Sequence, residues 1–518
     1  MSGLAQHLVI APVAIPLACG ALLLLFDERR HAAKAAVSLS GALLLVLVAA
    51  ALVARSDASV AIVYALGSWP APFGIVLVAD RLSATMVLLA ATLGLAALTF
   101  AVARWERAGA HFHSLAHVLL AGLCGAFLTG DLFNLFVFFE LLLAASYGLA
   151  LHGSGAPRVR AGLHYVAVNL AASLLFLVGV SLMYGIAGTL NMADLAERLP
   201  HVAPGDRALL ETGAAMLGLA FLVKAAMWPL GFWLPPTYTA ASAPAGALFA
   251  ILSKVGIYAI VRVWLVVFGG EPGAPLLIGG GLATLAYGTL GMVSSQDLGR
   301  LASYSLVVSS GTLLAACGLG GTLATAAAIY YLVASTLGVA ALFLLVELVE
   351  RTRAPGANIL AVTADAFGLA GEETDVDDGT GVAIPAALAV LGIAFTVAAL
   401  LVAGLPPLPG FVAKFAILAA VLDADPVPTA AWALLALLML SGLAAVVGLG
   451  RAGVRAFWAE RERVVPRVRV IEMLPVAALL AACVALTVGA APALRYLQDA
   501  AREVVSPSGY IQQVLHPR

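Results

Sequence analysis

Four ionisable side chains lie deep inside apolar stretches of the sequence, where a charged group is costly. They are Glu140, Lys224, Lys254 and Lys414. At the centre of a lipid bilayer a charge costs at least about 2.5–3.5 kcal/mol, so each of these residues is expected to be neutral, paired or beside internal water. Carboxylates and lysines that gain and lose protons in this setting are typical of proton and cation pathways.

Two of these residues are too far from either membrane surface to reach it. Glu140 has about ten residues on either side in its apolar run, so its carboxyl lies roughly 15 Å from water. Lys254 is near the middle of 241–267, about 20 Å from either end, whereas a lysine stem spans only about 6 Å. The alternative for Glu140 is a neutral glutamic acid that is hydrogen-bonded to a neighbouring helix.

The other two lysines lie beside helix-breaking prolines. These prolines are Pro229, Pro235 and Pro236 after Lys224, and Pro406, Pro407 and Pro409 before Lys414. Irregular backbone at membrane depth is tolerated only inside protein or against a water-filled cavity. Two interrupted helices in corresponding parts of two halves predict paired inverted repeats with a pathway near the midplane. The alternative is that each helix ends at its proline, with the lysine near an interface.

The chemistry implied by these residues is proton handling. Desolvation favours the uncharged form of a buried lysine or glutamate, whereas a close Glu–Lys pair favours both charged forms. At about 4 Å and an effective dielectric constant near 20, the attraction is roughly 4 kcal/mol. Moving Glu140 and Lys224 apart would therefore switch a proton on or off Lys224. His164, Tyr258 and Ser309 are candidates for supporting the relay, with helix packing as their alternative role.

The composition sets the class of the protein. Apolar residues make up 63 % of the 518 residues and charged residues only 11 %, against about 45–50 % and about 25 % in soluble domains. This is the composition of a polytopic membrane protein. The net charge of −1 offers no basic face for nucleic acid. The four cysteines are isolated, without the spacing of a metal site or disulfide framework, so we expect no metal and no cofactor.

Apolar runs of about 20 residues, the length that crosses a bilayer, predict about fourteen spans in an all-α polytopic membrane protein. Their approximate limits are 4–26, 33–54, 75–103, 112–130, 131–151, 162–187, 209–236, 241–267, 275–294, 301–318, 322–349, 382–422, 429–449 and 471–491. The first run lacks the basic flank of a signal peptide, and acidic and basic residues follow it. We therefore expect a retained first helix.

Lys and Arg are distributed unevenly between the loops. With the N-terminus outside, the inner loops hold sixteen of them and the outer side holds eight. The positive-inside rule favours this arrangement and predicts both termini outside. Residues 352–381 form a long acidic inner loop, which is either a docking surface or a mobile insertion. We interpret the Arg-rich stretch 451–469 as a topology determinant at the lipid headgroups.

Two segments carry a resemblance to a known family. They are 130–140, which ends at Glu140, and 224–258, which contains Lys224, the sequence Phe232-Trp-Leu-Pro-Pro and Lys254. The chain resembles the antiporter-like membrane subunits shared by respiratory complex I and the multisubunit cation/proton antiporters. Within that group it is most similar to the D subunit of the Mrp (Pha, Mnh) antiporters. The resemblance extends over nearly the whole chain.

The resemblance implies two inverted five-helix repeats, spans 4–8 and 9–13, and two broken helices. It assigns Glu140 and Lys224 to a glutamate–lysine pair, and Lys254 to a central lysine. Lys414 becomes the lysine of the second broken helix, which leads to the outer side. The corresponding segments are 1–110 for the N-terminal helices, 111–268 and 269–450 for the two repeats, and 451–518 for the Arg-rich segment, last helix and tail.

The resemblance also implies a function and partners. The D-type protein is expected to conduct protons, while the A-type protein of the same complex, or the interface with it, handles the cation. We therefore predict a proton-translocating component of a Na+ or K+/proton antiporter, not an enzyme, in a bacterial inner membrane with partners of the A, B, C, E, F and G types. One alternative is a proton-pumping component of a complex I-like or membrane-bound hydrogenase complex. The other is a structural scaffold with vestigial charges.

The sequence departs from the family pattern in two places. Complex I relatives usually carry a histidine and an acidic residue where this chain has Gly231 and Pro236, which favours the antiporter branch. The family also often has a histidine in span 11, where this chain has Ala334. The link between Lys254 and Lys414 is therefore expected to depend on hydroxyl groups and water.

Overall fold

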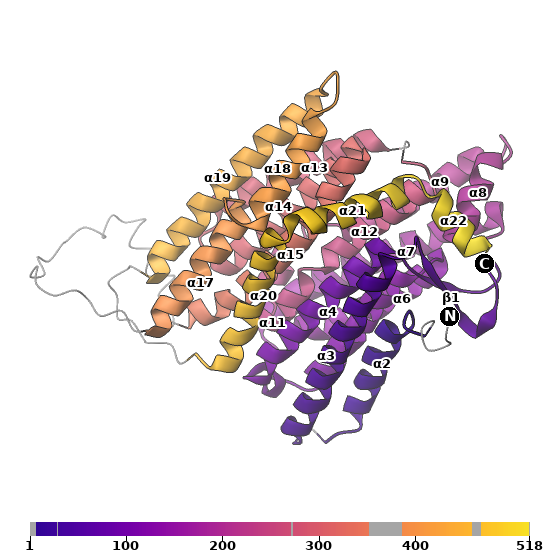
Figure 1. The fold of residues 1–518 in the computed structure, drawn as a ribbon. Coiled ribbons are helices and arrows are strands. Elements are labelled where there is room, and N and C mark those ends of the chain that lie inside the picture. Colours follow the sequence, from indigo (N-terminus) through magenta and orange to yellow (C-terminus); the bar gives the residue numbers. More distant parts are fainter. Residues whose placement is uncertain (1–6, 28, 271–272, 352–385, 458–467, 517–518) are drawn as a thin grey trace, which may run out of the picture.

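The computed structural model describes residues 7–27, 29–270, 273–351, 386–457 and 468–516, and they form a bundle of long helices (Figure 1). Among them, 11 helices are long and apolar enough to cross a membrane. Three shorter apolar helices accompany these. The expected all-α polytopic membrane fold is confirmed, while the count of fourteen spans, the two inverted repeats and the four segments stay predictions. The acidic loop 352–381 lies outside the described residues.

The elements have the following bounds. The helices are α2 (Ala11–Leu24), α3 (His31–Ser56), α4 (Arg81–Val102), α5 (Phe112–Leu128), α6 (Leu132–Leu151), α7 (Ala156–Ala187), α8 (Met192–Arg198), α9 (Arg207–Lys224), α10 (Leu234–Ala240), α11 (Ala243–Phe249), α12 (Leu252–Val266), α13 (Ala274–Ser294), α14 (Leu298–Leu319), α15 (Thr322–Glu350), α17 (Ala386–Ala403), α18 (Pro409–Leu422), α19 (Thr429–Phe457), α20 (Val470–Val488), α21 (Ala490–Val505) and α22 (Ser508–Leu515). The strands are β1 (Ile62–Ala65) and β2 (Val76–Ala79), and the short 3-10 helices are η1 (Leu66–Ser68), η2 (Trp105–Arg107) and η3 (Leu199–His201).

A short antiparallel hairpin corrects the predicted start of the third span. Strands β1 and β2 pair with Ile62 opposite Ala79, so the run from residue 75 begins as a strand and becomes helical only at α4. Asp80 caps that helix, because its carboxylate accepts from the Ser83 N–H while the Ser83 hydroxyl receives the Asp80 N–H. Apolarity alone does not distinguish a β-branched strand from the start of a helix.

Three of the expected spans are interrupted in the structure. One is divided between α9 and α10, and another between α17 and α18, as the prolines predict. A third, slighter interruption lies at Ala250 and Ile251 between α11 and α12, where both residues keep right-handed helical dihedral angles. The stretch Ala243–Val266 still counts as one of the 11 spans, in agreement with the expected span 241–267. Neither proline nor glycine occupies those two positions. Local sequence signals for a break are therefore missing there.

Helices α12, α14 and α15 form the centre of the bundle, with almost all of their residues buried. Small residues bring neighbouring backbones into contact: a Cβ on Gly311 would collide with the Leu285 nitrogen, and one on Gly281 would collide with the Ala315 nitrogen. Such close approach is typical of membrane helices, where association depends on tight packing. The peripheral helices α3 and α20 leave apolar side chains exposed, as a lipid-facing surface requires.

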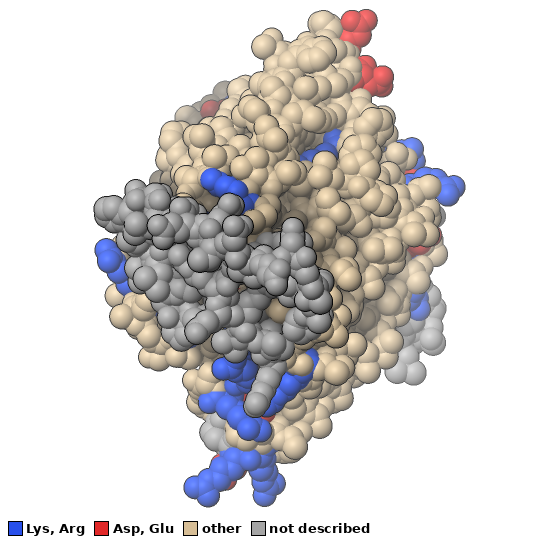
Figure 2. Space-filling model, turned by 90° about the vertical axis from the view of Figure 1, so that its left-hand side faces the viewer, with Lys and Arg blue, Asp and Glu red and all other residues tan. Residues whose placement is uncertain are grey.

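The described ends of the chain lie at the same end of the bundle (Figure 1). His7 is hydrogen-bonded to Tyr64 of β1, and Gln513 of α22 accepts the Ala61 N–H at 2.7 Å. On the face shown in Figure 2, which lies at the other end, Lys and Arg side chains gather at the lower edge and right rim, and acidic groups stand at the upper tip. Both termini outside stays a prediction, which this arrangement supports.

Helix α21 packs across α4, α12 and α15, and α22 packs against α8 and β1. Apolar residues of α21, among them Leu497 and Val504, are buried against the bundle. Glu503, also on α21, forms an ion pair with Arg81 at the start of α4. Burial raises the pKa of Glu503 to about 7, although the positive charge of Arg81 opposes that shift.

The raised pKa of Glu503 predicts that the docking of α21 and α22 weakens as pH increases. The docked carboxyl binds its proton more tightly than a free one, whose reference pKa is 4.5. Docking is therefore strongest below that value and loses stability as pH rises towards 7. Amide hydrogen exchange over 490–515, corrected for intrinsic rates, should be several-fold faster at pH 8 than at pH 5. Glu503→Gln should remove this difference, and equal protection at both pH values would contradict the prediction.

Candidate functional site

Glu140 on α6 and Lys224 on α9 lie within electrostatic range of each other. Glu140 lies in the middle of α6, and Lys224 is the last residue of α9. The charges are near enough to attract each other, but the Lys224 ammonium donates to Ser173 Oγ at 3.4 Å and lies 5.0 Å from the centre of the Phe139 ring. Glu140 Oε1 is buried and lacks a hydrogen-bond partner among the described residues. The pair therefore keeps an unused acceptor, which costs free energy unless a proton or water occupies it.

At the break after Lys224, side chains form hydrogen bonds with backbone groups that a continuous helix would pair with each other. Trp233 Nε1 donates to the Val223 carbonyl at 3.2 Å, and Thr284 Oγ1 accepts the Trp228 N–H at 2.8 Å. Pro229 lies in this turn, whereas Pro235 and Pro236 lie in the first turn of α10. The last carbonyls of α9 are the negative end of a helix dipole, a setting that favours a cation at Lys224.

Lys254 is completely buried in the first turn of α12, immediately after the third interruption. Its ammonium donates to Ser310 Oγ of α14 at 3.4 Å. Two residues further along, a Cβ on Gly256 would lie 2.5 Å from the Ala225 nitrogen and 2.8 Å from the Lys224 carbonyl carbon. Only glycine allows this backbone contact, which brings the end of α9 against the start of α12. The segments that carry Lys224 and Lys254 therefore meet at this crossing.

Hydroxyl groups continue from Lys254 into the second half of the chain. Ser309, next to Ser310, is hydrogen-bonded to Ser335 of α15 at 2.9 Å. Ser335 in turn lines a cavity of about 20 Å³, roughly the space of one water molecule. The cavity is also bounded by Ser305, Tyr331, Ala334, Leu401, Gly410 and Ser441. Ala334 thus lies where the family pattern often has a histidine, and the space beside it is available to water.

Lys414, in α18, reaches back across the interruption between α17 and α18. Its ammonium donates to the carbonyl of Ala403, the last residue of α17, at 2.9 Å. Its stem lies over Gly404, which has a φ of +74° and whose Cβ would be 2.7 Å from Lys414 Cδ. Gly410 meets the Leu401 carbonyl, and both residues line the small cavity. Lys414 therefore lies just beyond the cavity, at the C-terminal end of a half-helix. Pro406 and Pro407 form the turn, and Pro409 begins α18.

The structure does not bring His164 or Tyr258 into this row. His164 is exposed, and its Nδ1 contacts the Arg160 carbonyl one turn earlier on the outer face of α7. The Tyr258 hydroxyl donates to the Phe127 carbonyl at 2.6 Å and receives N–H groups from Arg262. Sequence spacing placed both residues at the right depth, but His164 is on the wrong face of its helix and the Tyr258 hydroxyl is engaged by other partners. Ser309 does lie in the row.

Sequence reasoning missed the serines that connect the lysines. Ser173, Ser310 and Ser335 lie in apolar helices where a hydroxyl usually bonds to its own backbone. The run of serines in 303–310 was a signal, but it did not indicate which of them face Lys254. Within the described ranges, no cluster of His, Cys, Asp and Glu is placed to hold a metal ion.

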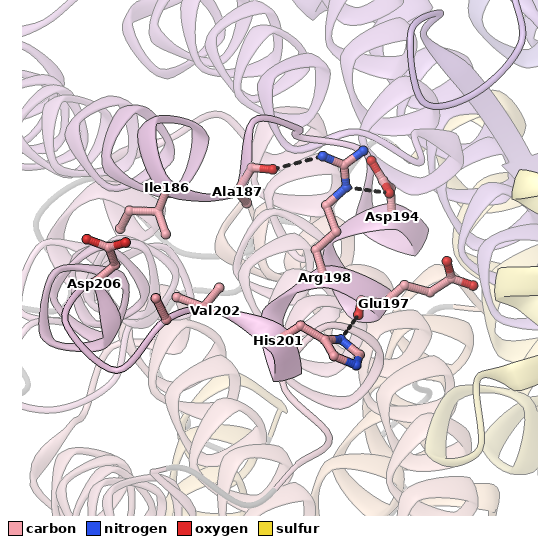
Figure 3. A pocket seen from close by; sticks show the side chains of 9 residues that line it. Ile186, Ala187, Asp194, Glu197, Arg198, His201, Val202 and Asp206 are labelled. Atoms are coloured by element: carbon pink, nitrogen blue, oxygen red, sulfur yellow. Dashed lines mark hydrogen bonds and ion pairs between the residues drawn. The ribbon is translucent and has the colours of Figure 1, made fainter.

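A broad hollow of about 580 Å³ lies away from the lysines, at the C-terminal end of α7 and beside α8 (Figure 3). Arg198 lines it and donates to Asp194 at 2.8 Å and to the Ala187 carbonyl at 3.1 Å. Lys224 is at the opposite end of α9 from the hollow, about 25 Å along the helix axis. These contacts fix α8 to the end of α7 and have no connection to the row.

Comparison with known proteins identifies the family. The sequence pattern described as "NADH:quinone oxidoreductase/Mrp antiporter, TM" matches residues 129–443, which contain Glu140 and all three buried lysines. The chain belongs to this antiporter family. The D subunit of a probable K(+)/H(+) antiporter of Rhizobium meliloti (strain 1021) is 53 % identical, with 98 % of each chain covered.

Two further relatives of the NADH:quinone oxidoreductase/Mrp antiporter family agree. The D subunit of the Na(+)/H(+) antiporter of Alkalihalophilus pseudofirmus is 36 % identical, with 98 % of this chain and 99 % of the relative covered. In the solved structure of the Mrp complex from Dietzia sp. DQ12-45-1b, one chain superposes with a TM-score of 0.85 at 27 % identity, covering 99 % of this chain and 100 % of that one. The relatives are antiporter subunits, which are transporter components and not enzymes.

The crossing at Gly256 provides a test of the geometry. Gly256→Ala places a methyl group against the backbone of Lys224 and Ala225, and overpacking of this kind costs about 1–3 kcal/mol. We expect a lower thermal stability in detergent and a reduced exchange activity in vesicles. Gly218→Ala on α9, where a Cβ meets nothing within 4 Å, is the matched control and should change neither. Wild-type stability of Gly256→Ala would contradict the close contact.

Proposed function

We propose that this chain is the proton-translocating subunit of a Mrp-type monovalent cation/proton antiporter. One observation carries the proposal: Lys224, Lys254 and Lys414 each adjoin a helix interruption, and buried hydroxyl groups and a small cavity lie between them. Lysine suits a relay because it releases its proton when desolvated, whereas arginine stays charged. Half-helix carbonyl ends beside Lys224 and Lys414 favour the protonated form of these two lysines, so neither of their states is prohibitively costly.

In the proposed mechanism, Glu140 and Lys224 act as an electrostatic switch. When the two groups are close, their attraction keeps Lys224 protonated; when they separate, desolvation favours release of the proton. The proton passes to Lys254, then along Ser310, Ser309 and Ser335 and through water in the cavity. Lys414 receives it at the end of α17. Repulsion between neighbouring protonated lysines favours forward transfer.

The chain would act within a larger assembly. The relatives are named as D subunits of K+/H+ and Na+/H+ antiporters. We therefore propose partners of the A, B, C, E, F and G types, with the cation handled by the A-type partner or at the interface with it. The setting is a bacterial inner membrane, with both termini outside.

A second candidate function is a proton-pumping subunit of a redox complex. The family description includes NADH:quinone oxidoreductase as well as Mrp antiporters, so the proposed relay is compatible with either assembly. The naming of the relatives as antiporter subunits favours the first function. Neighbouring genes distinguish the two: genes for small antiporter subunits support the proposal, and genes for iron–sulfur or hydrogenase subunits support the redox complex.

The switch predicts that Glu140→Ala and Lys224→Ala abolish nearly all cation/proton exchange by the assembled complex in vesicles. Lys224→Arg should fail as well, because it preserves a positive charge but not a transferable proton. Glu211→Ala, at an exposed site on the same helix α9, is the control and should retain exchange. Normal exchange with Glu140→Ala and Lys224→Ala would instead identify a scaffold with vestigial charges.

The second-half pathway predicts a separate effect at Lys414. Lys414→Ala removes the group that bonds to the Ala403 carbonyl at the end of the row. We expect proton release to the outer side, and therefore exchange, to fall strongly while the complex still assembles. Fluorescence of a pH probe in vesicles measures exchange, and co-purification of the other subunits measures assembly. Unimpaired exchange would exclude Lys414 from the pathway.

A further inference from the structure

Helix α12 carries a polar stripe that leads away from the proposed row. Lys254, Tyr258 and Arg262 follow one another at intervals of four residues, so they lie along one side of the helix. Arg262 Nε and Nη2 lie 3.3 Å and 3.2 Å from the Tyr258 hydroxyl. The stripe runs from the buried lysine towards the end of α12 that α21 covers. It points from Lys254 towards the surface at that end of the bundle.

The outer end of this stripe is closed by a buried ion pair. Arg262 binds Asp80 with two parallel hydrogen bonds, at 2.5 Å and 2.8 Å, and both residues are at most 3 % exposed. The ring of Tyr510, from α22, lies 5.4 Å from the guanidinium carbon. Arg81, next to Asp80, pairs with Glu503 of α21. The C-terminal helices therefore cover the pair.

The Tyr258 hydroxyl cannot pass a proton from Lys254 to this end. It donates its own proton to the Phe127 carbonyl, and two donors of Arg262, Nε–H and Nη2–H, approach the same oxygen. A hydroxyl has one donor and two acceptor positions, so all three are in use. Beyond it, Arg262 carries a charge that it does not release. A fixed arginine charge in a narrow polar path repels protons, as it does in water-selective pores.

We propose that Arg262 and Asp80, with Tyr258, form an electrostatic seal that prevents protons on Lys254 from leaking to the outer side along α12. This inference rests on the proposed relay through Lys254. The seal leaves the serine row towards Lys414 as the available direction. The seal also explains why this contact is an ion pair, because apolar side chains of similar volume would hold α4 and α12 together with equal or greater stability.

The test neutralises the pair and measures proton leakage. Complexes carrying Asp80→Asn together with Arg262→Gln are placed in sealed vesicles with a pH gradient and without an exchangeable cation. Loss of the gradient should be at least several-fold faster than with the wild-type complex. Adding Lys254→Ala should return the leak to the wild-type rate. Arg262→Gln alone should leak at least as fast, because Asp80 then becomes a proton acceptor.

A matched control removes a different ion pair, in which the carboxylate is buried and the arginine is partly buried. Arg351 at the end of α15 binds the buried carboxylate of Glu472 on α20 at 2.6 Å, away from the stripe. Arg351→Gln with Glu472→Gln should leave the membrane tight to protons. This control separates loss of a buried pair in general from loss of the seal.

Three results would overturn the seal. The first is that the assembled Asp80/Arg262 double variant does not leak. The second is that the leak persists when Lys254→Ala is added. The third is that neither the double variant nor Arg262→Gln assembles, which would assign the pair a purely structural role. Failure of the proposed function is a different result: Lys254→Ala alone would then exchange cations and protons normally. The two failures are therefore distinguishable.

Discussion

The cost of an unpaired polar group in hydrocarbon determines most of this structure. An interrupted helix leaves backbone groups without partners, and in a membrane each must be satisfied by protein or by water. Here the Lys414 ammonium binds the last carbonyl of α17, and Trp233 and Thr284 bind backbone groups around the break after α9. The same interruptions place lysines at half-helix ends. The groups proposed to carry protons thus lie where the fold already needs polar partners.

Close backbone contact is the second requirement, because a relay depends on short distances. Gly256 lets α12 touch the end of α9, and Gly404 leaves room for the stem of Lys414. Larger side chains at either position would separate the elements that carry the lysines. The proposed seal sets the direction of proton transfer. Arg262 and Asp80 close one exit from Lys254, and the serines and the small cavity provide the other.

Particular residues show how far sequence reasoning reaches. Glu140 and the three lysines stand out because a charge in an apolar run is costly wherever the helix packs, and proline marks two of the three interruptions regardless of context. The break before Lys254 has no such mark in the sequence. Ala250 favours a helix and Ile251 is close to neutral, so neither residue predicts an interruption. The hairpin of β1 and β2 was missed for a related reason, because its strands are as apolar as a span.

The sequence by itself determined the membrane class, the depth of the ionisable residues and two of the helix breaks, because each follows from local hydrophobicity and proline. Only the tertiary structure decided which polar groups meet. His164 faces away from the row, and the hydroxyl of Tyr258 is taken up by the Phe127 carbonyl and Arg262, whereas Ser310 and Ser335 face into the row. Asp80 and Arg262 are 182 positions apart and meet only in the folded bundle. The direction of a side chain depends on how helices pack against one another, and that is a property of the assembled bundle, not of any one segment.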